Sequence, residues 1–214
     1  HRRRIGLYPI ADVHDDLVGE RPIVASDPEL AAVPPDTVGA PVQTGYFHEP
    51  KNQRLPDEIE AFLAQGPAPV YIGFGSMTDP NPEATTRLLV DAVGRAGCRA
   101  LVSRGWAGLA EGRLPDGVLA IGRVAHLNLF SRVAAVIHHG GSGTTAAAAR
   151  SGARQIIVPH LMDQFYWGKR IASLNVGPRP IPRRKLSSER LGAAIRSPLA
   201  DSRNHFREPL HACA

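Results

Sequence analysis

The sequence predicts an α/β protein built on a doubly wound parallel sheet, and three observations support this. Short apolar runs typical of buried strands alternate with segments of helical periodicity from about residue 56 to residue 195. The 21 glycines and 19 prolines suit the many turns that such connections require. Residues 134–164 have the pattern of strand, glycine-rich turn, helix and strand, in that order. Strands joined through helices pair in parallel by right-handed crossovers, and this pairing produces the predicted sheet.

The first 48 residues lack clear periodicity. Residues 1–6 have the pattern of a helix end. Short strands are expected at residues 22–26 and 42–46, with a proline-rich connection between them.

Beyond residue 48 the signals are stronger. An apolar face predicts a helix at residues 56–65. A second helix is expected from Asn81, a good N-cap followed by Pro82 at the first helical position, to Gly97. The remaining strands are expected at residues 70–74, 99–102, 118–121, 134–137 and 155–158, and the remaining helices at 127–132, 146–150, 164–174 and 186–195.

The composition describes an ordinary globular protein, with 43% hydrophobic and 21% charged residues. No apolar run approaches the roughly 20 residues that span a bilayer, and no signal peptide is visible. Cys98 and Cys213 are the two cysteines, which form neither a disulfide framework nor a ligand cluster. We therefore expect a cytoplasmic protein with reduced thiols, no metal site, no cofactor and no membrane span.

The net charge of +5 raises the possibility of nucleic-acid binding. The basic residues are scattered, however, apart from the runs at residues 2–4 and 183–185. Neither run is interleaved with the aromatic side chains that stack on bases. We expect no nucleic-acid partner, and instead an attraction for a small anionic ligand.

Residues 134–164 carry the strongest functional signal. A buried strand ends at His138 and His139, and the turn Gly-Gly-Ser-Gly-Thr-Thr leads into an alanine-rich helix. Glycines let the backbone approach a ligand, and a helix N-terminus presents unpaired N–H groups and partial positive charge to an anion. The next strand brings Asp163 and Gln164 to the same edge of the sheet, where ligands of open α/β sheets bind. We expect a phosphate-bearing ligand on the turn, with Asp163 and Gln164 contacting its hydroxyl groups.

Other interpretations of these residues remain open. The turn matches neither common phosphate-binding loop, so the glycines could serve packing alone. The histidine pair could simply end the strand, with His138 the more structural of the two. Asp163 is also a good N-cap for the following helix.

Taken together, HHGGSGTT, AARSGA, QIIVP and DQ resemble the donor-sugar signature of family 1 glycosyltransferases of the GT-B fold. The actinobacterial enzymes that glycosylate the vancomycin-type glycopeptide aglycone are the most similar. Further segments match in order and spacing: VQTGYF, LPDEIEAFL, PVYIGFGSM, SRGWAGL and VGPRPIP. The resemblance implies that residues 49–214 form a Rossmann-like domain that binds the nucleotide-sugar donor. Residues 1–48 would then be the remnant of an acceptor-binding N-terminal domain and the segment that crosses from it.

The resemblance also assigns roles to individual residues. His139 would bind the nucleotide diphosphate together with the amides that follow it, and Asp163 and Gln164 would bind hydroxyls of the transferred hexose. For Arg104 and Trp106, an exposed arginine and a core tryptophan are the alternatives. The full nucleotide and diphosphate set comprises Ser76, Arg104, Trp106, Val124, His126, His139, Gly141, Ser142, Gly143 and Thr144.

Two departures from the family pattern limit these assignments. Ala147 stands where plant members place a glutamate that binds ribose, so the choice between UDP and dTDP stays open. The general base that activates the acceptor is kept on the N-terminal domain in this family, and most of that domain is absent from the sequence. We expect donor binding without transfer by the chain alone. If the chain did transfer sugar, His14, Asp15 and Asp16 would be the first candidates for the base.

The expected function is inverting transfer of a hexose from a UDP- or dTDP-sugar to a hydroxyl of a natural-product aglycone such as a glycopeptide, in antibiotic biosynthesis. Orphan strands of the first domain would expose apolar surface and favour self-association. An alternative is a non-catalytic nucleotide-sugar-binding subunit that needs a separate acceptor-domain partner. Another GT-B enzyme, such as a sugar epimerase, is disfavoured by the SRGW and DQ matches.

Overall fold

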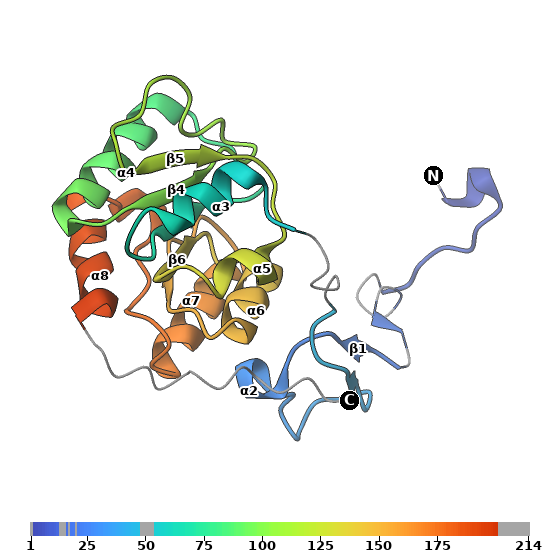
Figure 1. The fold of residues 1–214 in the computed structure, drawn as a ribbon. Helices are drawn as coiled ribbons and strands as arrows, with labels where there is room; N and C mark the ends of the chain where they lie inside the picture. Colours follow the sequence, from blue (N-terminus) through green and yellow to red (C-terminus); the bar gives the residue numbers. More distant parts are fainter. Residues whose placement is uncertain (1, 13–15, 17, 20, 48–53, 201–214) are drawn as a thin grey trace. The chain divides into compact units, whose positions relative to one another are not determined.

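The structure of the 214-residue chain is a computed structural model that describes residues 2–12, 16, 18, 19, 21–47 and 54–200 (Figure 1). The chain divides into two compact units, His1–Phe47 and His48–Ala214. Of the three candidate bases, His14 and Asp15 lie outside the described residues.

The first unit contains the two predicted strands, each only two residues long, which pair in parallel. They are β1 (Ile23–Val24) and β2 (Val42–Gln43), with Ile23 opposite Val42. A 3-10 helix, η1 (Arg2–Ile5), lies near the start, and a short helix that was not predicted, α2 (Pro28–Ala31), follows β1. The Gln43 side chain connects α2 to the strands, because its amide donates to the carbonyls of Ser26 and Ala31.

The second unit is organised around five parallel strands: β3 (Val70–Gly73), β4 (Ala100–Ser103), β5 (Val118–Ile121), β6 (Ala135–His138) and β7 (Gln155–Ile157). Their order in the sheet is β5-β4-β3-β6-β7. The chain starts in the centre, moves outward through β4 and β5, and then returns to β6 on the other side of β3. The predicted doubly wound parallel sheet is therefore confirmed, and its order reverses between β3 and β6.

Two apolar layers cover the two faces of this sheet, because successive strand residues point to opposite faces. Val70 and Ile72 pack with α4 (Pro82–Ala96) and α8 (Ser188–Ala200), whereas Tyr71 packs on the opposite side with α3 (Asp57–Ala64), α5 (His126–Phe130) and α6 (Ser142–Arg150). Helices α4 and α8 lie side by side in Figure 1. The other described helices of this unit are α7 (Gln164–Ser173) and the 3-10 helix η2 (Arg183–Lys185).

The two ends of α4 lie where the capping residues predict them. The side chain of Asn81 accepts a hydrogen bond from the N–H of Ala84 at 3.0 Å, and Gly97 ends the helix in the left-handed conformation, with φ of 65°. Both ends agree with the prediction.

Helix α6 begins at Ser142, four residues before the alanine run that predicted it. The backbone N–H and the hydroxyl of Thr145 both bond to the carbonyl of Gly141, which makes Gly141 the N-cap. Ser142, Gly143 and Thr144 therefore form the first helical turn instead of a separate loop.

Candidate functional site

The residues predicted to bind the donor all follow the carboxyl ends of the five parallel strands. These ends lie at one edge of the sheet, and the crevice between β3 and β6 is where ligands bind in such sheets. Ser76 follows β3, Arg104 and Trp106 follow β4, Val124 and His126 follow β5, His139, Gly141, Ser142, Gly143 and Thr144 follow β6, and Asp163 and Gln164 follow β7.

The imidazole ring of His139 lies between two glycines. A Cβ atom on Gly75 would come within 2.9 Å of Cε1 of this ring, and one on Gly141 within 2.5 Å of Nε2. Both glycines therefore make room for the ring. His139 is 9% exposed, and its Nδ1 is buried without a hydrogen-bond partner among the described residues. The described part of the fold therefore leaves this ring nitrogen without a hydrogen bond.

Burial lowers the pKa of His139, the neighbouring His160 and His126 lower it further, and only Asp163 acts in the opposite direction. The ring is therefore neutral near pH 7. A neutral imidazole carries one N–H, so His139 can donate one hydrogen bond to an anion.

His138 has a different environment, because the fold uses both of its ring nitrogens. The N–H of Gly140 donates to Nδ1 at 3.1 Å, so Nε2 carries the proton and donates to Oε1 of Gln155 at 2.9 Å. Gln155 in turn donates to the carbonyl of Thr145 inside α6. Burial lowers the pKa of His138 to about 3, and the hydrogen bond to Gln155 opposes this only in part. His138 thus ties the glycine turn to β7 and α6.

The N-terminus of α6 presents the anion-binding groups beside these histidines. The N–H groups of Ser142, Gly143 and Thr144 occupy the first helical turn, where no intrahelical acceptor exists. All three residues are half-buried. Gly140 turns the chain into the helix with φ of 93°, and a Cβ atom there would come within 2.7 Å of the Ile157 side chain.

The turns after β3 and β4 are in direct backbone contact. The N–H of Trp106 donates to the carbonyl of Gly75 at 3.0 Å, and a Cβ atom on Gly105 would come within 2.7 Å of the same oxygen. This contact brings Trp106 and its neighbour Arg104 close to Ser76. The Trp106 side chain is 78% exposed, so the alternative of a core tryptophan is wrong.

His126 and Val124 are both half-buried beyond β5. The His126 ring stacks on Phe130, with centroids 4.7 Å apart, and lies edge-on to Tyr71 at 5.9 Å. Burial, and then the charge of Arg123, lower the pKa of His126. The ring is a neutral, packed side chain at the edge of the candidate site.

Asp163 and Gln164 differ sharply in exposure. Asp163 is exposed, and its Oδ2 accepts a hydrogen bond from the indole of Trp167 at 3.2 Å. It holds the N-cap position of α7 without a side-chain capping bond. Gln164 is 4% exposed, and its side-chain oxygen accepts from the N–H groups of His160 and Leu161 at 2.8 and 3.1 Å. That oxygen closes the loop between Pro159 and α7 and is not free for a sugar.

A buried ion pair beside this loop was not predicted from the sequence. The guanidinium of Arg183 donates to Oδ2 of Asp79 at 2.7 Å, and the Asp79 side chain is only 3% exposed. Thr85 donates to the same oxygen. Burial raises the pKa of Asp79, but the hydrogen bonds from Arg183, Asn81 and Thr85 outweigh it and lower the pKa overall. The pair joins the segment after β3 to η2, and no local pattern links residues so far apart in the sequence.

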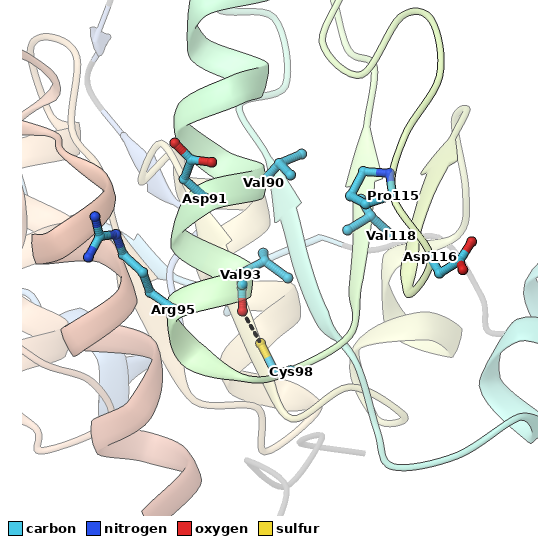
Figure 2. A pocket seen from close by; sticks show the side chains of 9 residues that line it. Val90, Asp91, Val93, Arg95, Cys98, Pro115, Asp116 and Val118 are labelled. Carbon is cyan, nitrogen blue, oxygen red and sulfur yellow. Dashed lines mark hydrogen bonds between the residues drawn. The ribbon is translucent and has the colours of Figure 1, made fainter.

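A pocket of about 540 Å³ lies at the opposite, amino edge of the sheet. Figure 2 shows Val90 and Val93 of α4 facing Pro115 and Val118 across it, with the thiol of Cys98 directed at the Val93 carbonyl. It shares no residue with the candidate donor site.

Among the described residues, no group of three or more His, Cys, Asp or Glu side chains could hold a metal ion. No helix in the described ranges is long and apolar enough to cross a membrane.

Residues 88–208, more than half of the chain, match the family described as erythromycin biosynthesis protein CIII-like, C-terminal domain. The chain belongs to this CIII-like family. The match covers β4 to α8, and thus the glycine turn, the histidine pair and the loop that carries Asp163.

Two of the curated relatives of this CIII-like chain are enzymes of Amycolatopsis orientalis. The vancomycin aglycone glucosyltransferase is 46% identical over 201 residues, which cover 91% of this chain and 48% of the relative. The dTDP-epi-vancosaminyltransferase is 40% identical over 210 residues, covering 94% of this chain and 51% of the relative. The chain spans about half the length of each of these two relatives.

The fold of this chain is similar to solved structures of glycosyltransferases. The glycosyltransferase VinC in complex with dTDP is 27% identical, with a TM-score of 0.53 over 69% of this chain and 37% of that one. UDP-glucose: anthocyanidin 3-O-glucosyltransferase in complex with UDP is 14% identical, with a TM-score of 0.69 over 86% of this chain and 45% of that one. The second likeness concerns the fold alone. The CIII-like chain thus has the C-terminal domain fold of GT-B glycosyltransferases.

Proposed function

We propose that this chain is the donor-binding half of an inverting glycosyltransferase. In this proposal, the diphosphate of a UDP- or dTDP-sugar binds at the N-terminus of α6, and the hexose lies toward Asp163. The sugar passes to a hydroxyl of a natural-product aglycone of the glycopeptide type. The observation that carries the proposal is the pairing of the first turn of α6 with a His139 ring whose Nδ1 has no hydrogen-bond partner among the described residues.

This arrangement suits the charge that develops during the reaction. When the bond from the anomeric carbon to the diphosphate breaks, negative charge accumulates on the phosphate oxygens. The N–H groups of Ser142, Gly143 and Thr144, the helix dipole and the N–H of His139 would stabilise that charge. The positive end of the helix would thereby serve in place of a metal ion. The proton of the acceptor hydroxyl must go to a general base, which we assign to no residue here.

The exposed indole of Trp106 and the neighbouring Arg104 support a nucleotide next to the diphosphate. An exposed aromatic face can stack on a base, and a guanidinium can pair with the phosphates. The relatives that resemble this chain include enzymes named for a glucosyl and a dTDP-sugar transfer. Uridine and thymidine donors both remain part of the proposal.

The acceptor, self-association and location are further parts of this proposal. In the first unit, Ile23, Val42 and Phe47 are 64%, 54% and 67% exposed. Apolar surface of this kind favours association with another copy or another protein. The composition, with two cysteines and no disulfide framework, supports a cytoplasmic location.

Isothermal titration calorimetry of the 214-residue chain tests the donor site. We expect UDP or dTDP to bind with a dissociation constant in the micromolar range or below, and AMP and NAD to bind at least about ten-fold more weakly. Binding of NAD alone, or of none of the four nucleotides, would contradict the proposal.

A further inference from the structure

The His160 side chain is held rigidly at the start of the loop that carries Asp163. Its ring Nδ1 lies 2.9 Å from the carbonyl oxygen of Val158, and its backbone N–H donates to Gln164. The ring also packs edge-on against Phe74, with centroids 5.2 Å apart. The bond at Nδ1 and the packing against Phe74 therefore orient this imidazole.

These contacts also fix the tautomer. A carbonyl oxygen can only accept, so Nδ1 carries the proton and donates to Val158. Nε2 is then left with a lone pair and no proton. It has no hydrogen-bond partner among the described residues, and it is not one of the buried unpaired atoms, so it is accessible. The fold thus presents a single, pre-oriented hydrogen-bond acceptor.

The His160 ring adjoins the candidate donor site. Phe74, against which the ring packs, precedes Gly75, and the backbone of Gly75 borders the His139 ring. His160 and Asp163 both act electrostatically on His139, which places all three in one neighbourhood.

The loop therefore offers two acceptors to a ligand, the Nε2 atom of His160 and the carboxylate of Asp163. The side-chain oxygen of Gln164, a residue expected from the sequence to contact sugar hydroxyls, is already used twice by backbone N–H groups. A sugar presents hydroxyl groups, each of which can donate to such an acceptor. A phosphate oxygen cannot, because it carries no proton at neutral pH and would meet a bare lone pair.

We propose that Nε2 of His160 accepts a hydrogen bond from a hydroxyl of the transferred hexose, and so helps to select the donor sugar. This inference rests on the proposed function, since it concerns the sugar part of the same donor. It adds His160 to Asp163 and Gln164, the residues that the sequence pattern places near the sugar hydroxyls.

Two substitutions separate the two ring nitrogens. His160→Asn places an amide nitrogen near the position of Nδ1, so it keeps the donor to Val158 and removes the acceptor at Nε2. His160→Gln places its amide oxygen near the position of Nε2 and gives up the bond to Val158. Tyr166→Phe, at an exposed position in the first turn of α7, is the matched control. Thermal denaturation verifies that each variant is folded.

The measurement is calorimetric affinity for UDP, UDP-glucose, dTDP and dTDP-glucose. Where wild type binds a nucleotide sugar more tightly than the bare nucleotide, His160→Asn should bind that sugar about five-fold more weakly, the effect of one neutral hydrogen bond. Its affinity for the bare nucleotide, and both affinities of Tyr166→Phe, should stay within about two-fold of wild type. His160→Gln should recover most of the loss.

Other results would overturn the inference. If His160→Asn weakened UDP and UDP-glucose equally, His160 would act on the diphosphate site and not on the sugar. If it left all affinities unchanged, or if wild type gained no affinity from the sugar, Nε2 would not bind a hydroxyl. If wild type bound no nucleotide, the proposed function itself would fail, and that result is distinct from the others.

Discussion

Nε2 of His139 lies where Gly141 leaves space for it: a Cβ atom on Gly141 would approach this nitrogen to 2.5 Å. The backbone of Gly141 has φ of −65° and ψ of 143°, which any residue adopts. The glycine is therefore required by the neighbouring ring and not by the turn. A substitution of Gly141 should therefore displace the His139 ring without straining the backbone of the turn.

We expect Gly141→Ala to weaken binding of UDP or dTDP by about ten-fold, because the imidazole must move away from the diphosphate site. The free energy of unfolding should fall by only about 1 kcal/mol, the difference between glycine and alanine at an N-cap. Calorimetry and urea denaturation measure the two effects. Gly94→Ala, with open space around an exposed helical position, is the control and should leave binding intact. Unchanged nucleotide affinity in Gly141→Ala would show that the ring position does not matter.

Replacement by alanine should mainly weaken nucleotide binding at His139 and mainly lower stability at His138. His139→Ala removes a side chain whose Nδ1 has no described partner, so it should weaken nucleotide diphosphate binding by about ten-fold or more with little loss of stability. His138→Ala breaks the chain of bonds from Gly140 to Gln155 and leaves buried groups unpaired. It should cost about 2–4 kcal/mol of unfolding free energy and affect binding less. Equal losses of affinity in the two variants would mean that the pair acts as one structural unit.

The stability of the protein should fall in mild acid because of His138. Its pKa is about 3 in the folded protein, against an ordinary value of 6.5. Below pH 6.5 the His138 side chain binds a proton in the unfolded chain but not in the folded protein. The stability that is present above pH 6.5 is therefore lost as the pH falls toward 3. One such group contributes up to about 1.4 kcal/mol per pH unit. Burial also lowers the pKa of other histidines, which act in the same direction: His126, His139 and His160.

Urea denaturation between about pH 4.5 and 6.5 measures this slope in a window above the titration of most carboxylates. His138→Gln keeps an amide that can donate to Gln155 but cannot take up a proton. Its slope should be smaller than that of wild type by up to about 1.4 kcal/mol per pH unit. Identical slopes in the two proteins would place the acid sensitivity elsewhere.

The regular part of the fold could be predicted because its causes are local. The strand at Val70–Gly73 is a short apolar run between turns, and α4 carries both of its end signals in its own sequence. The start of α6 was missed because glycine and threonine are weak helix formers. The hydrogen bonds from Thr145 to the Gly141 carbonyl begin the helix there nonetheless.

The site could be predicted at the level of strand ends but not of side-chain contacts. Each candidate residue follows a strand, and parallel strands bring their ends to one edge. The burial of Gln164 depends on backbone N–H groups that turn back toward it, and the pairing of Asp79 with Arg183 joins segments about a hundred residues apart. Neither contact leaves a periodic or local signal. The roles assigned to the individual donor-site residues stay predictions.

The 214 residues by themselves should bind the donor without transferring its sugar. Holding the acceptor hydroxyl against the anomeric carbon, and accepting its proton, accounts for a large part of the rate in such reactions. The groups at the carboxyl edge of the sheet are those proposed to bind the diphosphate and the hexose, and the chain spans about half the length of the two glycosyltransferases of Amycolatopsis orientalis described above. Incubation with radiolabelled UDP-glucose or dTDP-glucose and a vancomycin-type aglycone tests this expectation. Slow release of free sugar is compatible with donor binding alone, because water can replace the acceptor. Glycoside formation at enzyme-like rates would instead require a general base within these residues, and substitution of Asp16 would then be the first experiment.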